Sequence, residues 1–181
     1  MEPLKRILAN IVKESAGVDY EKVFQEVISM LHGELCRLMT VRDDEVAVLL
    51  LDKMNNVRFL RPKYLEKAGF IPYSYTRAFV VKVMQTRSVG IDNRFHSTQH
   101  LSLFEDFKKN NPNQIPIQKM LCVPLIRGET HSFGAVQLSR KGLTPEKAGP
   151  DWRETDGERV FEFLQPLSDN LYILCKHAGI V

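Results

Sequence analysis

The segment that most constrains the fold of this chain is IQKMLCVPLIRGETHSFGAVQLSRKG, residues 117–142. Its first part, Ile117–Ile126, is apolar on nearly both faces, which is typical of a buried central strand. Its second part, His131–Ser139, alternates, and one of its sides would carry Phe133, Ala135 and Gln137. Residues 127–130 between them are polar and have an ordinary length for a hairpin turn. The segment therefore predicts a β-hairpin in the middle of a sheet.

Length and composition indicate one globular domain without a nucleic-acid or membrane partner. The chain has 181 residues, of which 44% are hydrophobic and 26% charged, and this is ample for one core. The formal net charge of +3 is small and the basic residues are scattered, so the electrostatic footprint of a nucleic-acid-binding protein is missing. The longest purely apolar run, Val46–Leu51, is too short to cross a bilayer, and residues 1–15 lack the apolar stretch of a secretory signal.

The cysteines Cys36, Cys122 and Cys175 are widely spaced and form no CxxC pair. This pattern indicates reduced thiols in a cytoplasmic protein rather than a disulfide framework or a zinc site. Cys122 lies inside the first predicted strand of the hairpin, and we expect it to be a buried, unreactive side chain.

Helices are predicted at both ends of the chain and a sheet between them. The spacing of apolar residues predicts helices over Pro3–Ser15, Tyr20–Met39 and Glu154–His177, with Pro166 expected to kink the last one. The middle of the chain predicts shorter elements, namely strands over Glu45–Leu51, Val57–Arg61 and Ser88–Asp92, and helices over Ser74–Gln85 and Leu101–Asn110. Strands paired as hairpins between terminal helices indicate an α+β fold with an antiparallel sheet. We expect residues 1–17 to be a helical extension and residues 18–178 to be a single domain.

Several segments resemble those of GAF domains, the small α+β sensory modules of signalling proteins. The resemblance rests on the strand ending in VPL and the following FGAVQLSRK, on FVVKVMQTRSVGIDN before them, and on GPDWRETDGERVFEFL after them. These segments come in the order expected for the family, over roughly Tyr20–Lys176. The resemblance implies a GAF-like sheet rather than a PAS-like or profilin-like one.

In GAF domains a ligand pocket lies between one face of the sheet and the segments that follow the third strand. Mapped onto this chain, the resemblance implies a ligand-binding set of charged, amide, imidazole and aromatic side chains: Asp92, Asn93, Arg94, Phe95, His96, His100 and Phe104. Such a set could hold a small polar or planar molecule by hydrogen bonds and stacking. The alternative is a surface loop in which Phe104 folds back over the sheet. His96 and His100 would share a helical face, but no cysteine or carboxylate has complementary spacing, so no metal site is expected.

Some cyclic-nucleotide-binding GAF domains carry Asn-Lys after the hairpin and Phe-x-x-x-Asp-Glu at the last helix. Here the corresponding residues are Arg140-Lys141 and Trp152-x-x-x-Asp156-Gly157. The resemblance implies a structural salt bridge between Lys141 and Asp156. Because the Asn and the Glu are missing, it does not favour a cyclic nucleotide, and the sequence identifies no ligand or cofactor.

No pattern in the chain predicts catalysis. GAF-related reductases of free methionine sulfoxide carry cysteines before the hairpin, but residues 108–120 contain none. No cysteine lies where bilin-binding GAF domains attach their pigment, and no Ser-His-Asp order or HExxH motif is present. The chain is therefore expected not to be an enzyme.

The terminal helices leave two functions open. Their apolar spacing suits packing on the sheet of the same chain or across a dimer, and GAF domains commonly dimerise through such helices. Since helix 3–15 has more apolar surface than a lone helix can leave in water, a homodimer through the terminal helices is predicted. The first function is a small-molecule sensor that signals through contact with a partner protein. The alternative is a ligand-free dimerisation or scaffold domain.

Overall fold

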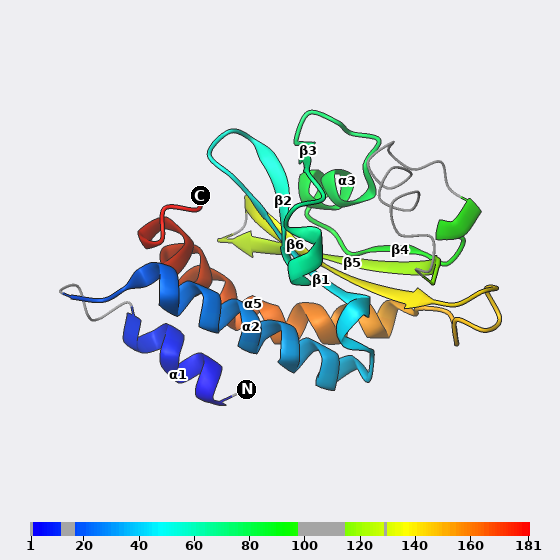
Figure 1. Cartoon of the computed structure of the whole chain (residues 1–181), viewed down its shortest axis with the longest axis horizontal. Helices are drawn as coiled ribbons and strands as arrows, with labels where there is room; N and C mark the ends of the chain where they lie inside the picture. Colours follow the sequence, from blue (N-terminus) through cyan, green and yellow to red (C-terminus); the bar gives the residue numbers. More distant parts are fainter. Residues whose placement is uncertain (1, 12–16, 98–114, 129) are drawn as a thin grey trace.

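The computed structural model of the protein describes residues 2–11, 17–97, 115–128 and 130–181 (Figure 1). Within these ranges the helices are α1 (Glu2–Ile11), α2 (Tyr20–Met39), α3 (Phe79–Thr86) and α5 (Glu154–His177). The strands are β1 (Val46–Leu51), β2 (Asn56–Arg61), β3 (Phe70–Pro72), β4 (Gly90–Asp92), β5 (Ile117–Arg127) and β6 (His131–Lys141). Short 3₁₀ helices lie at Asp43–Glu45, Lys63–Leu65 and Phe95–Ser97.

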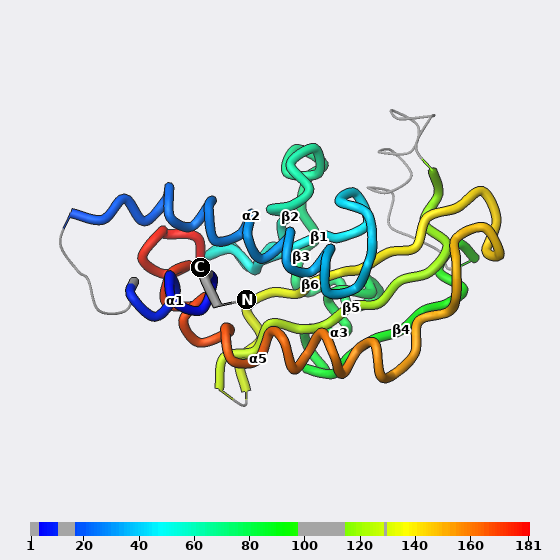
Figure 2. The backbone as a smooth tube through the Cα atoms, turned by 90° about the horizontal axis from the view of Figure 1, so that it is seen from below, coloured from blue at the N-terminus to red at the C-terminus, as the bar shows by residue number. Residues whose placement is uncertain are grey.

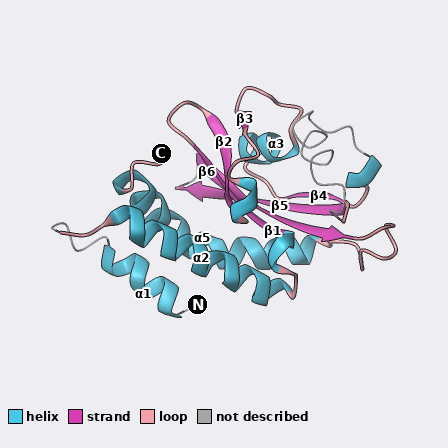
Figure 3. Cartoon of the chain, in the orientation of Figure 1, coloured by secondary structure: helices cyan, strands magenta, loops and turns pink. Residues whose placement is uncertain are grey.

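The strands form one antiparallel sheet in the order β3-β2-β1-β6-β5-β4, with helices on both faces (Figures 1 and 3). We call the side covered by α1, α2 and α5 the helical face; its core includes Phe24, Leu31, Leu121, Val136 and Leu164. The other side, the α3 face, packs Val80 and Met84 of α3 against Leu49, Cys122 and Ala135 of the sheet. The predicted α+β fold is confirmed.

The predicted hairpin is confirmed as β5 and β6, although β5 is next to the edge strand β4 rather than in the middle of the sheet. The pairing is irregular near the turn, because Leu125 pairs with Gly134 but Ile126 pairs with Ser132. Phe133 is the extra residue of this bulge, and it turns to the helical face whereas Ala135 lies on the α3 face. The prediction that Phe133 and Ala135 share one side was therefore wrong.

The bounds of the long helices agree with the prediction. Helix α2 begins after Asp19, whose carboxylate accepts a hydrogen bond from the N–H of Lys22, and it ends at Met39. Helix α5 continues through Pro166 to His177. Helix α3 begins later than predicted, because backbone hydrogen bonds from Tyr75 and Ala78 form turns before it. The predicted helix over Leu101–Asn110 lies outside the described residues.

Helix α1 packs against α2 and α5 of its own chain (Figure 2). Leu4 and Leu8 are each 1% exposed and belong to the core of the helical face. The apolar surface from which a second copy was predicted is thus covered within the chain, and the homodimer stays a prediction. None of the helices in the described ranges combines the length and the apolarity needed to span a bilayer.

Candidate functional site

The predicted ligand-binding residues Asp92–His96 form a tight turn at the end of β4. Asp92 pairs with Met120 of β5, and its carboxylate accepts a hydrogen bond from the N–H of Arg94 at 2.9 Å. The hydroxyl of Ser97 donates to the carbonyl of Arg94 at 2.8 Å. These bonds hold the turn beside the start of β5.

Asn93 and Phe95 are engaged within the protein. The amide of Asn93 donates to the carbonyl of Trp152 at 3.0 Å and accepts from the N–H of Trp152 at 2.9 Å. Phe95 is 5% exposed, and its ring lies 6.3 Å from that of Phe79 in α3. These two residues fix the turn to α3 and to the segment before α5.

Arg94 and His96 are exposed, and Asp92 is half-buried, so these three residues present ionisable groups at the turn. The Nδ1 of His96 lies 3.4 Å from the carbonyl oxygen of Gln118 in β5. The predicted His100 and Phe104 lie outside the described residues. The structure thus brings Asp92–His96 together and leaves the rest of the predicted set untested.

Beside this turn the sheet carries buried polar side chains that the sequence analysis did not single out. Gln137 and Ser139 of β6 are 6% and 5% exposed, and they pair with Cys122 and Met120 of β5. Side chains alternate along a strand, so Gln137 and Ser139 lie on the α3 face with Ala135. In the sequence these two residues stand out only because they are polar at alternate positions of a strand that is otherwise largely apolar.

Gln118 adds an unpaired buried acceptor to this region. Its side-chain N–H donates to the carbonyl of Gly142 at 2.7 Å, but its Oε1 is buried without a hydrogen-bond partner in the described structure. Such an atom costs free energy unless a donor reaches it. We call these three buried polar residues of β5 and β6, Gln118, Gln137 and Ser139, the polar floor; the hydroxyl of Ser139 donates to the carbonyl of Glu45 at 3.2 Å.

The predicted salt bridge between Lys141 and Asp156 is not formed. Lys141 is 6% exposed, and its ammonium group contacts the carboxylate of Asp44 at 2.8 Å. Asp156 instead accepts a hydrogen bond from the N–H of Arg153 at the start of α5. The reason is topological: β6 pairs with β1, so the end of β6 lies against the 3₁₀ helix that precedes β1.

Lys119 makes the connection from the sheet to the segment before α5. Its ammonium group donates to the carbonyl of Gly149 at 2.6 Å and lies 2.8 Å from the carboxylate of Asp151. Beside it, the guanidinium of Arg140 lies 4.0 Å from the centre of the Trp152 ring. These contacts close the end of the sheet next to the Asp92–His96 turn.

The cysteines are poorly suited to nucleophilic chemistry. Cys122 is fully buried, and this burial raises the pKa of its thiol. Burial raises the pKa of Cys175 to about 12, and burial followed by the negative charge of Asp43 raises that of Cys36 to about 11. Each thiol is therefore protonated near neutral pH, whereas the nucleophile is the thiolate.

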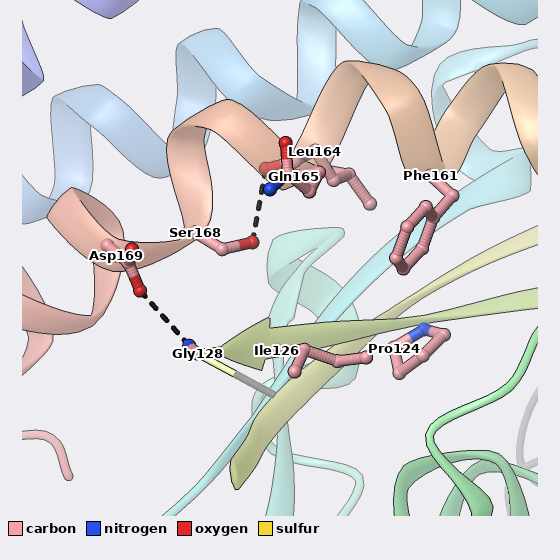
Figure 4. A pocket seen from close by; sticks show the side chains of 8 residues that line it. All are labelled: Pro124, Ile126, Gly128, Phe161, Leu164, Gln165, Ser168 and Asp169. Atoms are coloured by element: carbon pink, nitrogen blue, oxygen red, sulfur yellow. Dashed lines mark hydrogen bonds between the residues drawn. The ribbon is translucent and has the colours of Figure 1, made fainter. Parts of the chain in front are cut away.

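A separate hollow of about 500 Å³ lies between α5 and the end of β5 (Figure 4). Figure 4 shows Phe161 and Leu164 facing the strand; the lining is Pro124, Ile126, Gly128, Phe161, Leu164, Gln165, Ser168 and Asp169. Its polar groups largely satisfy one another or the backbone, since Asp169 accepts from the N–H of Gly128 and Ser168 donates to the carbonyl of Leu164. The hollow offers few polar groups that a ligand could use for orientation.

No protein-family model and no curated protein sequence matches the chain. Solved structures do match it. The GAF domain of an Acinetobacter phosphoenolpyruvate-protein phosphotransferase aligns with a TM-score of 0.61 at 14% identity, over 99% of this chain and 96% of that one. The blue-light absorbing form of the PixJ GAF domain from Thermosynechococcus elongatus aligns with a TM-score of 0.58 at 12% identity, over 90% and 91%.

An enzyme is also among the matches. The type II free methionine-R-sulfoxide reductase from Thermoplasma acidophilum aligns with a TM-score of 0.57 at 10% identity, over 86% of this chain and 97% of that one. At such identities the likenesses concern the fold alone. They show that this chain has the fold of a GAF domain, as its sequence motifs predicted.

Proposed function

We propose that this protein is a non-catalytic regulatory module that binds a small molecule on the α3 face of its sheet and signals through contact with a partner protein. The observation that carries the proposal is the polar floor, Gln118, Gln137 and Ser139, beside the Asp92–His96 turn. A sheet face that only packs against a helix is normally apolar, because burying a polar side chain costs free energy.

The chemistry of the site favours a ligand with both polar and apolar parts. The unpaired Oε1 of Gln118 calls for a hydrogen-bond donor, and the exposed Arg94 places a positive charge at the turn. Met120 supplies an apolar, polarizable contact next to Ser139. Arg94 and His96 would then form the rim of the site and the polar floor its base.

A non-catalytic role is supported by the thiols. The similar reductase from Thermoplasma acidophilum is an enzyme, but the cysteines of this chain are protonated near neutral pH, and Cys122 and Cys175 are buried. The segments outside the described ranges contain no further cysteine. Nucleophilic catalysis by a thiolate is therefore disfavoured.

A thermal-shift screen against cyclic nucleotides, dinucleotides, amino acids and bilins tests the proposal. A ligand at about 100 times its Kd contributes about 2.7 kcal/mol, which corresponds to a rise in Tm of about 5–10 °C for a chain of this size. Gln137→Leu is expected to abolish this rise because it removes a polar group of the floor. Gln165→Leu, which alters the separate hollow beside α5, is the matched control and should retain it.

The outcomes separate the two functions left open by the sequence. A rise in Tm that Gln137→Leu removes supports the sensor. A rise that is lost only in Gln165→Leu would place the ligand beside α5 and contradict the proposed site. If no compound stabilises the protein, the ligand-free scaffold becomes the better account.

A further inference from the structure

Three potential metal ligands converge where α2 meets the 3₁₀ helix Asp43–Glu45. His32 and Cys36 are one turn apart on α2, and Asp43 faces them from the 3₁₀ helix. Their ligand atoms all lie within 4.8 Å of one another. The Nδ1 of His32 is 3.4 Å from Oδ1 of Asp43.

The backbone fixes the orientation of the His32 ring. His32 is 5% exposed, and its Nε2 lies 3.0 Å from the carbonyl oxygen of Asp43 and 3.1 Å from that of Val46. Since a carbonyl only accepts, Nε2 must carry the hydrogen. In a neutral ring, Nδ1 then presents a lone pair toward the carboxylate and the thiol sulfur. A cation between these three groups would be coordinated by the imidazole nitrogen, the carboxylate oxygen and, once the thiol has lost its proton, the sulfur.

The neighbouring charges leave Asp43 available for a cation. Asp44 pairs with Lys141 and Arg42, and Glu45 pairs with Arg42. The carboxylate of Asp43 contacts the imidazole of His32, and its side chain is 88% exposed. A cation here would therefore have one side open to water.

The distance between His32 Nδ1 and Asp43 Oδ1 suits two ligands of a tetrahedral site. Oxygen and nitrogen ligands at 2.0–2.1 Å from a tetrahedral zinc lie about 3.3 Å apart, close to the observed 3.4 Å. The sulfur of Cys36 is held by no more than a weak contact of 3.9 Å to the carbonyl of Arg42, so a small rotation can bring it into place. A ligating histidine that donates its other N–H to a backbone carbonyl is the usual supporting arrangement.

We propose that His32 Nδ1, Cys36 Sγ and Asp43 Oδ1 bind a divalent cation of the zinc class, with water at the fourth position. Thiolate, imidazole and carboxylate are a ligand set that suits zinc. Binding replaces the thiol proton, which is released to solvent, by the cation. The cation would join the end of α2 to the connection that leads into β1, and this role is independent of the proposed ligand on the α3 face.

The test uses the full untagged chain and competition with a chromogenic zinc chelator. One equivalent of zinc is expected to bind, and Cys36→Ser and Asp43→Asn are each expected to weaken binding at least about 10-fold. These positions are partly or largely exposed, whereas His32 is buried and its replacement would also disturb folding. His96→Gln and Asp151→Asn, which alter an exposed histidine and an exposed carboxylate elsewhere, are the matched controls and should bind as the parent does.

Cobalt provides a second readout. Co²⁺ in the site should show thiolate-to-metal charge-transfer absorption that is lost in Cys36→Ser but kept in His96→Gln. Absence of stoichiometric binding would overturn the proposal. Binding that Cys36→Ser and Asp43→Asn leave unchanged, or that His96→Gln removes, would also overturn it.

Discussion

The buried cations Arg61, Lys119 and Lys141 each donate hydrogen bonds to backbone carbonyls. Lys119 of β5 donates to the carbonyl of Gly149, and Lys141 of β6 donates to the carbonyl of Asp44. Both carbonyls lie outside the strands that carry the lysines. A buried charge is costly unless it is paired and hydrogen-bonded. These side chains therefore tie the sheet to its connections in one arrangement, and their removal would take a hydrogen-bond donor from partly buried carbonyls.

Asp52 holds the β1–β2 turn by hydrogen bonds to its carboxylate, and this predicts that the stability of the protein depends on pH. Its carboxylate accepts hydrogen bonds from the N–H groups of Met54 and Asn56 and from the guanidinium of Arg58. Burial acts to raise the pKa of Asp52, but these bonds outweigh it and hold the pKa below its usual value. The stability that the ionised Asp52 carboxylate adds to the folded protein is thus complete above the unfolded pKa of about 4. It is lost as the pH falls through the folded pKa.

We expect Asp52→Asn to be less stable than the parent by about 1 kcal/mol at pH 7, since the interactions are partly exposed. The difference should shrink below pH of about 4, where the parent carboxyl becomes neutral. Urea unfolding across this range measures it. Glu158→Gln, at an exposed position of α5, is the control for loss of one charge. A deficit that stayed constant into acid would mean that the ionised carboxylate is not its source.

At the scale of the elements, the close spacing of β1 and β6 depends on Gly134. An added Cβ there would lie 2.5 Å from the carbonyl oxygen of Leu49 and 2.6 Å from the side chain of Leu50. The backbone of β1 cannot move away, because β2 pairs with its other side. We expect Gly134→Ala to lower the free energy of unfolding by about 1–3 kcal/mol or more, measured by urea denaturation.

Gly33→Ala is the matched control. An added Cβ at Gly33 in α2 has no atom within 4 Å, so this substitution should stabilise the helix by about 0.5–1 kcal/mol. If Gly134→Ala and Gly33→Ala changed the free energy of unfolding equally, β1 and β6 could move apart without cost, and the predicted role of Gly134 would be wrong.

The elements differ in how well the sequence predicts them. The bounds of α2 and α5 follow from long apolar periodicity, and Asp19 marks the start of α2. β3 was not predicted, because Phe70–Pro72 is too short to show a period. The inward turn of Phe133 was also not predictable, since the bulge exists only once β5 and β6 are paired.

At the scale of the whole molecule, the candidate site was predictable in part. The Asp92–His96 turn could be located from the order of the motifs, but Gln137 and Ser139 join it only through the pairing of β5 with β6. The local sequence around His32 does not predict the environment of its ring. His32 is buried because the 3₁₀ helix and β1 bring carbonyl groups to its ring. Contacts of this kind depend on tertiary register, which local patterns do not contain.

Whether α1 packs in the core of its own chain or against a second copy is also a property of the whole molecule. Leu8 is 1% exposed against α2 and α5, so Leu8→Ala is expected to lower the free energy of unfolding by about 2–5 kcal/mol. Arg6→Ala, on the exposed side of α1, should have little effect.

Urea unfolding at low and high protein concentration distinguishes packing of α1 within its chain from packing against a second copy. If the chain covers its own helix, the midpoint does not depend on concentration, whereas a second copy would raise it with concentration by mass action. A concentration-dependent midpoint that Leu8→Ala abolishes would assign α1 to the predicted homodimer instead.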